Sequence, residues 1–140
     1  MTTGGDRWIH VLGLVLVSAI LVGCASAGGS GSQSEGAGYQ DISVEQLAAM
    51  LDDKDFVLVN VHIPYEGEIP HTDLFIPFDE IENHLDELPA KDARIVLYCR
   101  SGSMSTTAAE MLASLGYSNV MEVDGGMRAW QAAGYDLLQQ

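Results

Sequence analysis

Positive charge is scarce in this sequence. Its 140 residues include 6 Lys and Arg against 20 Asp and Glu, for a formal net charge of −14. Nucleic-acid binding needs clustered Lys and Arg on the phosphates, so this composition argues against a nucleic-acid partner. Two cysteines are too few for a small fold held by several disulfides. A hydrophobic share of 47% argues against full disorder, and the length allows one compact domain with appendages.

A long apolar run is also missing near the N-terminus. The run at residues 11–22 has twelve residues, whereas a bilayer-spanning helix needs about 20. The run is typical of a signal peptide and ends in Leu-Val-Gly-Cys, which resembles a bacterial lipobox. We therefore predict a lipoprotein signal peptide at residues 1–23 and lipidation of Cys24. The alternative is an ordinary signal peptide, or an uncleaved anchor, with an incidental cysteine.

The next segment is almost entirely Gly, Ser and Ala. Residues 24–38 therefore comprise the lipidated cysteine and a flexible tether that buries too little to order itself. The globular domain is predicted at residues 39–140. This layout places the domain outside the cytoplasm, lipid-anchored to a cell membrane on its periplasmic or outer surface.

Apolar patterning within the domain predicts alternating helices and strands. Buried strands are expected at 56–61, 94–98 and 120–123, with a Pro- and Gly-rich loop at 62–78. Helices are expected at 44–51, at 81–88, from the turn at 99–104 to Gly116, and around Trp130. Such alternation predicts an α/β fold, a small mostly parallel sheet flanked by helices on both faces.

Cys99 is the residue whose position most strongly indicates chemistry. It directly follows a buried strand, in the turn Cys-Arg-Ser-Gly-Ser-Met-Ser, and precedes a helix. Ligands of open α/β sheets bind at the carboxyl ends of the strands, and backbone amides at a helix start favour negative charge. We expect a stabilised, nucleophilic thiolate, with Arg100 adding positive charge nearby. The alternative is a buried cysteine that only fills the core.

The motifs around Cys99 resemble those of the rhodanese-like sulfurtransferase family. Residues 98–103 (Tyr-Cys-Arg-Ser-Gly-Ser) are similar to its active-site loop. Residues 124–130, with Ala-Gly-Tyr at 133–135, resemble its closing Gly-Gly-x-x-x-Trp signature. Residues 56–62 stand where the family has a strand ending in Asp-x-Arg. The resemblance covers residues 39–138, which is nearly the whole predicted domain.

The resemblance implies that Cys99 takes a sulfane sulfur from a thiosulfate-like or persulfide donor, holds it as a persulfide and passes it to a thiophilic acceptor. A small thiol is the acceptor we expect, and no cofactor is implied. His62 is a candidate for binding the acceptor. The residues implied to bind substrate after Cys99 are Arg100, Ser101, Gly102, Ser103, Met104 and Ser105. The alternative function is a non-catalytic module of the same fold that binds a partner or senses persulfides.

Three departures from the family pattern bear on the substrate. Met104 stands where the loop usually ends in Arg, which removes a bidentate clamp for an oxyanion. Asn60 and His62 replace the Asp-x-Arg pair, and Gly-Glu-Ile-Pro-His at 67–71 approximates Gly-His-Ile-Pro-Gly. With the acidic composition, these changes predict weak steering of small anions such as thiosulfate. A phosphatase or arsenate reductase is disfavoured, because its loop ends in the Arg that phosphoryl transfer needs.

The sequence assigns no catalytic or metal-binding role to the remaining polar groups. His62, Glu66, Glu68 and His71 match no familiar metal-ligand spacing, so no metal is predicted and they are expected to face water. The acidic residues within 79–87 are expected on the solvated face of a short helix. Met127 and Trp130 are expected in the core.

Overall fold

The structure is a computed structural model that describes residues 38–139. The predicted signal peptide, Cys24 and nearly all of the predicted tether lie outside the described residues. Their assignment therefore stays a prediction. In the part of the chain that is described, no helix has the length and apolar character needed to cross a membrane.

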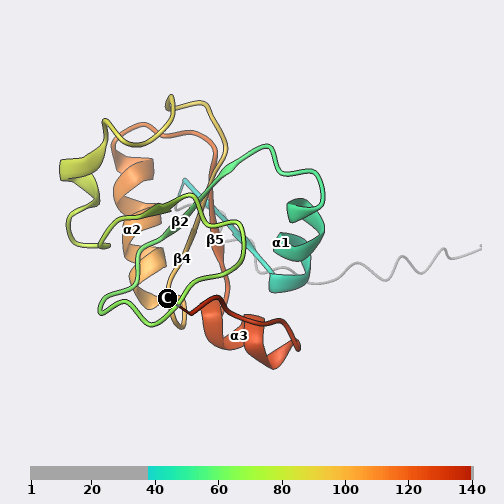
Figure 1. The fold of residues 1–140 in the computed structure, drawn as a ribbon. Coiled ribbons are helices and arrows are strands. Elements are labelled where there is room, and N and C mark those ends of the chain that lie inside the picture. The colour runs from blue at the N-terminus through green and yellow to red at the C-terminus, as the bar shows by residue number, and fades with distance from the viewer. Residues whose placement is uncertain (1–37, 140) are drawn as a thin grey trace, which may run out of the picture.

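A five-stranded sheet forms the centre of the domain (Figure 1). Its order is β1-β5-β4-β2-β3, and every neighbouring pair is parallel. The strands are β1 (Gln40–Ile42), β2 (Val57–Asn60), β3 (Leu74–Phe75), β4 (Ile95–Tyr98) and β5 (Val120–Val123). Parallel pairing brings the carboxyl ends of all these strands to one edge, where Asn60 lies opposite Tyr98.

Helices cover both faces, as predicted. The helix α2 (Ser103–Ser114) lies on one face, while α1 (Val44–Leu51) and α3 (Gly126–Ala132) lie on the other (Figure 1). A short 3₁₀ helix, η1 (Ile81–His84), accompanies α2. The start of α1 is fixed by a capping box, in which Ser43 Oγ accepts from the Gln46 amide and Gln46 Oε1 accepts from the Ser43 amide.

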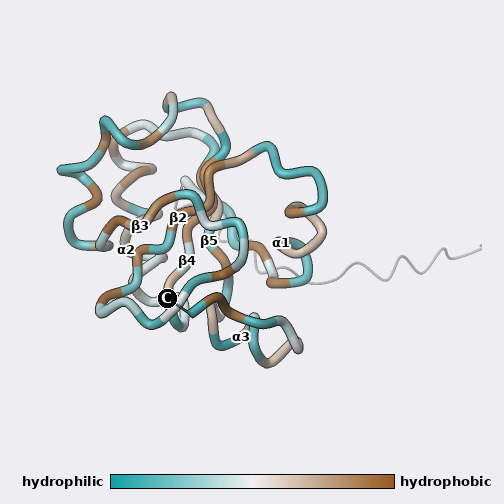
Figure 2. Tube along the Cα trace, viewed as in Figure 1, coloured by the Kyte–Doolittle hydropathy of each residue, from teal (hydrophilic) through white to brown (hydrophobic). Residues whose placement is uncertain are grey.

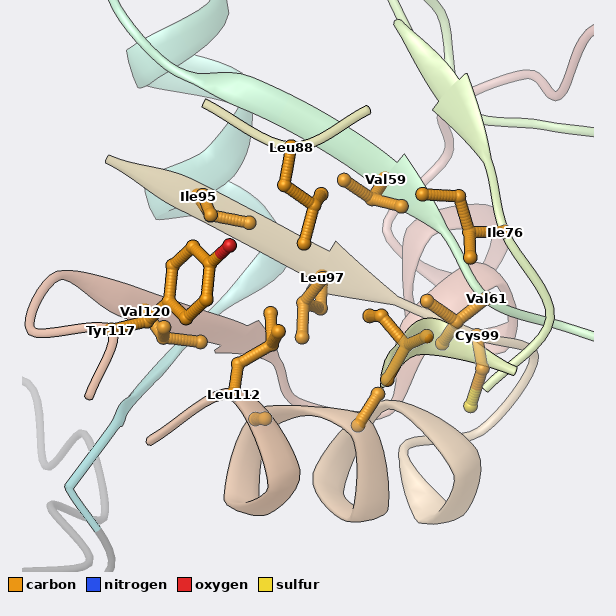
Figure 3. Packing of buried hydrophobic residues seen from close by; sticks show 13 residues of the cluster. Val59, Val61, Ile76, Leu88, Ile95, Leu97, Cys99, Leu112, Tyr117 and Val120 are labelled. Atoms are coloured by element: carbon orange, nitrogen blue, oxygen red, sulfur yellow. The ribbon is translucent and has the colours of Figure 1, made fainter. Parts of the chain in front are cut away.

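Strict alternation along the strands divides the core into two clusters. In β4, Ile95 and Leu97 pack toward α2, whereas Val96 and Tyr98 pack toward α1 and α3. Figure 2 shows the hydrophobic stretches concentrated in the central strands. Cys99 continues the Ile95–Leu97 alternation and therefore ends the cluster on the α2 face, as Figure 3 shows. Met127 and Trp130 are buried in the other cluster, which confirms their predicted place in the core.

The structure adds two strands and changes the bounds of two helices. Strands β1 and β3 were not predicted, because strands of three and two residues carry too little apolar pattern; β3 lies inside the predicted loop 62–78. The predicted helix 81–88 is the shorter η1, which ends at His84. Met104, predicted in the turn, already belongs to α2, because Gly102 at φ +101° completes the reversal earlier.

Candidate active site

Cys99 lies where β4 ends and the chain turns into α2. The residue is 1% exposed, so almost none of its surface reaches solvent. The loop is fixed from behind by the start of α3, where the Met127 amide donates to the Cys99 carbonyl (2.9 Å) and the Arg128 amide to the Arg100 carbonyl (3.0 Å). This approach requires Gly126, because a Cβ there would overlap the Cys99 carbonyl oxygen. The Gly-Gly turn thus holds the cysteine loop in place.

Two donors point at the sulfur of Cys99. The Gly102 amide lies 3.1 Å from Sγ, and the Ser105 hydroxyl lies 3.4 Å from it. Burial alone raises the pKa of the Cys99 thiol, but hydrogen bonds from the Ser105 hydroxyl and from the amides of Ser105, Ser101 and Gly102 outweigh it, so the pKa is lowered. A thiolate stabilised in this way is a nucleophile and a carrier for transferable groups.

Only some of the predicted loop residues bring a side chain to the sulfur of Cys99. Ser105 is fully buried and brings its hydroxyl to Sγ, whereas Ser103 is exposed and its carbonyl accepts from the Thr107 hydroxyl (3.2 Å). Met104 packs, partly buried, against the same core cluster as Cys99. The site described by the structure is therefore a cradle of backbone amides with one serine hydroxyl.

The side chain of Arg100 points to a carboxylate. It is 46% exposed, and its guanidinium lies 2.9 Å from Glu66 Oε1. The second oxygen of Glu66 lies 3.1 Å from His62 Nε2. Sequence reasoning gave Glu66 no role, because it lies 34 positions from Arg100 in a loop without periodicity. Glu66 balances the positive charge that Arg100 was expected to offer an anionic donor.

His62 does not face water, contrary to the prediction. It is 6% exposed; its amide donates to Asn60 Oδ1 (3.0 Å), while Asn60 Nδ2 donates to the Gly67 carbonyl (3.1 Å). These two hydrogen bonds of the buried Asn60 side chain hold the loop against the end of β2 and keep His62 buried. His62 Nδ1 is buried without a hydrogen-bond partner. Within residues 38–139, no three His, Cys, Asp or Glu side chains gather as metal ligands would.

A cleft opens beside the Arg100–Glu66 pair. Its volume is about 270 Å³, and Arg128 and Gln131 of α3 line it together with Met127. Arg128 was not singled out from sequence, although it stands inside the Gly-Gly-x-x-x-Trp motif. This arrangement gives the site a polar flank with two arginines and one carboxylate.

Glu122 is a third residue to which the sequence pattern assigned no role. It lies in β5 on the α2 face, is 2% exposed, and its Oε1 accepts from the Ser105 hydroxyl at 2.5 Å. Burial, with a smaller contribution from the charges of Asp41 and Asp124, raises its pKa to about 7. The available signal was a single acid inside the apolar strand Val-Met-Glu-Val, because a carboxylate is seldom fully buried without a partner.

Comparison with known proteins agrees with this geometry. Residues 43–133 match the rhodanese-like domain family. A sulfurtransferase of Allochromatium vinosum is 36% identical over 102 residues, covering 70% of this chain and 94% of that protein. The thiosulfate sulfurtransferase GlpE of Pseudoalteromonas translucida is 31% identical, over 68% of this chain and 91% of its own.

Solved structures agree as well. A rhodanese-related protein from Thermoplasma volcanium is 27% identical with a TM-score of 0.64, covering 73% of this chain and 100% of that one. The fold, the cysteine loop and these relatives lead to one conclusion: the chain belongs to the rhodanese-like family of sulfurtransferases.

Proposed function

We propose that Cys99 carries sulfane sulfur as a persulfide between a donor and a small thiol acceptor. The Cys99 thiolate attacks the sulfane sulfur of the donor and forms a new S–S bond. The donor's own bond to that sulfur breaks, and its electron pair leaves with the departing thiolate or sulfite. An acceptor thiolate then attacks the outer sulfur, and Cys99 leaves as a thiolate. Electrons and charges balance in both halves, and no cofactor is required.

One observation carries this proposal: a buried cysteine sulfur held between an amide and a hydroxyl donor. The Gly102 amide at 3.1 Å and the Ser105 hydroxyl at 3.4 Å stabilise negative charge on Sγ. The same donors would stabilise a persulfide, which also carries negative charge near neutral pH. Burial of Cys99 limits the access of water and large oxidants to that intermediate.

The charge beside the site favours a donor without a high negative charge. The Glu66 carboxylate forms an ion pair with the Arg100 guanidinium at 2.9 Å, and the uncharged Met104 adds no positive charge. A doubly charged donor such as thiosulfate would meet a neutralised arginine on a chain with net charge −14. A persulfide of a small organic thiol is therefore the donor class that we propose.

The proposal places this chemistry outside the cytoplasm. The Leu-Val-Gly-Cys motif and the Gly- and Ser-rich residues after Cys24 support a lipid anchor followed by a tether. The test is cell fractionation of the chain and of its Cys24→Ser variant. We expect the variant to leave the membrane fraction, and retention there would contradict lipidation.

Mass spectrometry of the intact protein tests the sulfur carrier. The full chain is prepared as Cys24→Ser, which leaves Cys99 as its only thiol, and is incubated with an organic persulfide or with thiosulfate. We expect the mass of one added sulfur with the organic persulfide, little with thiosulfate, and loss of the adduct when a small thiol is added. Cys99→Ser is the matched control. If neither donor labels Cys99, the carrier function is wrong and the non-catalytic module is favoured.

A further inference from the structure

Glu122 is a buried carboxyl group that the proposed sulfur transfer does not use. It comes from β5, where it lies on the same face of the sheet as Cys99 and points at the first turn of α2. Its exposure is 2%, and keeping a charged group there costs free energy unless it is paired or hydrogen-bonded. Its hydrogen-bond partner is the hydroxyl group of Ser105.

Ser105 has more acceptors than protons to offer them. Its Oγ lies 2.5 Å from Glu122 Oε1, 3.0 Å from the Gly102 carbonyl oxygen and 3.4 Å from Cys99 Sγ. A hydroxyl group carries one hydrogen, so it donates fully to one of these at a time. Glu122 is the nearest of the three acceptors, so the charge state of its carboxyl group affects which acceptor receives that hydrogen.

The surroundings of Glu122 raise the pKa of its carboxyl group, while the hydrogen bonds around Cys99 lower the pKa of its thiol. The pKa of Glu122 is raised to about 7, mainly by burial. The nearby carboxylates of Asp41 on β1 and Asp124 after β5 contribute to this rise. On the α2 face, Cys99 is the titratable group joined to it through Ser105. Because both groups accept from the same Ser105 hydroxyl, ionisation of either should oppose ionisation of the other.

We propose that Glu122 is a positioning residue that acts on Cys99 through the Ser105 hydroxyl. When Glu122 is protonated, it donates to Ser105 Oγ, and Ser105 donates to the sulfur. When Glu122 is ionised, it accepts the Ser105 proton, and the sulfur keeps only the amide donors. The importance of this switch for turnover rests on the proposed sulfur transfer, whereas its effect on the thiol does not.

The switch has a direct consequence for Cys99. In the protonated state of Glu122, the thiolate has an additional hydrogen bond and no buried negative charge beside it. In the ionised state it has lost that bond and gained that charge. A hydrogen bond to a charged group is worth enough to change the thiolate fraction about tenfold. Reactivity of Cys99 should therefore follow two ionisations, its own and that of Glu122.

The test is the rate of alkylation of Cys99 by iodoacetamide, measured from mildly acid to alkaline pH in the full chain carrying Cys24→Ser. We expect a profile with two ionisations in the parent. Glu122→Gln should show one, with alkylation near neutral pH about tenfold faster because a Gln amide donates to Ser105 Oγ at every pH. Glu110→Gln, at an exposed position of α2, is the matched control and should keep both ionisations.

A double-mutant cycle separates this relay from simple charge repulsion. In a Ser105→Ala background, the substitution Glu122→Gln should lose most of its effect on the alkylation profile, and Ser105→Thr, which keeps a hydroxyl, should restore it. An equal effect of Glu122→Gln with and without the Ser105 hydroxyl would overturn the proposal. So would a single ionisation in the parent chain. Alkylation uses no sulfur donor, so failure of the sulfur-carrier assay leaves this result readable, and the reverse also holds.

Discussion

The two faces of the sheet bury polar groups at the same edge, but they satisfy them differently. On the α1 and α3 face, the Ile69 amide donates to the Tyr98 hydroxyl oxygen (3.0 Å), and the Thr72 hydroxyl donates to the Ile69 carbonyl (2.6 Å). That leaves the Tyr98 hydroxyl to donate to Thr72 Oγ1 (2.7 Å). Every proton has one acceptor. On the α2 face, one Ser105 proton is shared among three acceptors.

The difference separates structural from reactive polar groups. Burial raises the pKa of the Tyr98 phenol above its ordinary range, so its closed network stays neutral and fixes the loop over β2. Burial also raises the pKa of Glu122, but only to about 7, so the network beside Cys99 changes its proton count near neutrality. A network with a matched set of donors holds one structure, whereas one short of donors responds to pH.

The largest expected effect comes from removing the support of the thiol loop. Gly126→Ala would press a Cβ onto the Cys99 carbonyl oxygen at a backbone φ of +52°. Overlap and strain together should lower the free energy of unfolding by about 4 kcal/mol, measured by denaturant titration. Gly134→Ala, at φ +90° with open space around it, is the control and should cost about 1 kcal/mol. Equal costs would show that close packing does not hold the loop.

Replacing the buried carboxyl group of Glu122 on the α2 face should change how the free energy of unfolding depends on pH. The folded protein keeps the Glu122 proton up to a pKa of about 7, above the ordinary 4.5. The native state therefore binds more protons between those values, and the free energy of unfolding falls as pH rises through them, by about 3 kcal/mol. Glu122→Gln should remove this loss, so that it exceeds the parent in stability at pH about 8. Thermal unfolding across pH measures this, and a parallel loss in the variant would contradict it.

Disrupting the hydrogen bonds of Tyr98 on the α1 and α3 face should lower the free energy of unfolding by an amount that does not depend on pH. Tyr98→Phe removes the acceptor of the Ile69 amide and the partner of Thr72. Leaving these buried groups short of a partner should cost about 1–2 kcal/mol throughout the neutral range. Tyr135→Phe, at a ring that is 37% exposed, serves as the control. A cost that rose or fell between mildly acid and neutral pH would break the contrast between the two faces.

The smallest effect concerns the charge at the mouth of the site. Glu66→Gln removes the carboxylate that holds Arg100 at 2.9 Å. Because this pair is exposed, its contribution is below about 1 kcal/mol, so anionic reagents should gain no more than about fivefold in rate. The measurement is the ratio of alkylation of Cys99 by iodoacetate to that by iodoacetamide, at low salt. An unchanged ratio would mean that Glu66 does not neutralise Arg100 toward incoming anions.

Much of the fold was predictable because its signals are local. Each of the apolar runs of β2, β4 and β5, and the capping box of α1, is made by residues within a few positions along the chain. Strands β1 and β3 were missed because three and two residues become strands only through their partners in the sheet. The end of η1 at His84 also lacked a local signal.

The site, like the fold, was predictable where its residues are neighbours in sequence and not where they are distant. Cys99, the amides that follow it and Ser105 are contiguous in sequence, so the thiol cradle followed from one turn. The burial of His62 depended on Asn60 reaching the Gly67 carbonyl. The partners Glu66 and Glu122 lie 34 positions from Arg100 and 17 positions from Ser105. No local pattern joins residues at such separations.

Sequence was sufficient for the family, the candidate nucleophile and the alternation of the longer strands with the helices, because each depends on neighbours along the chain. The net charge of −14 and the missing loop arginine were also visible there. Only the tertiary structure decided which charges act on Cys99. It paired Arg100 with Glu66 and placed Glu122 behind Ser105. The physical reason is that packing a parallel sheet brings distant side chains to one edge, where burial changes their charge states and allots their protons.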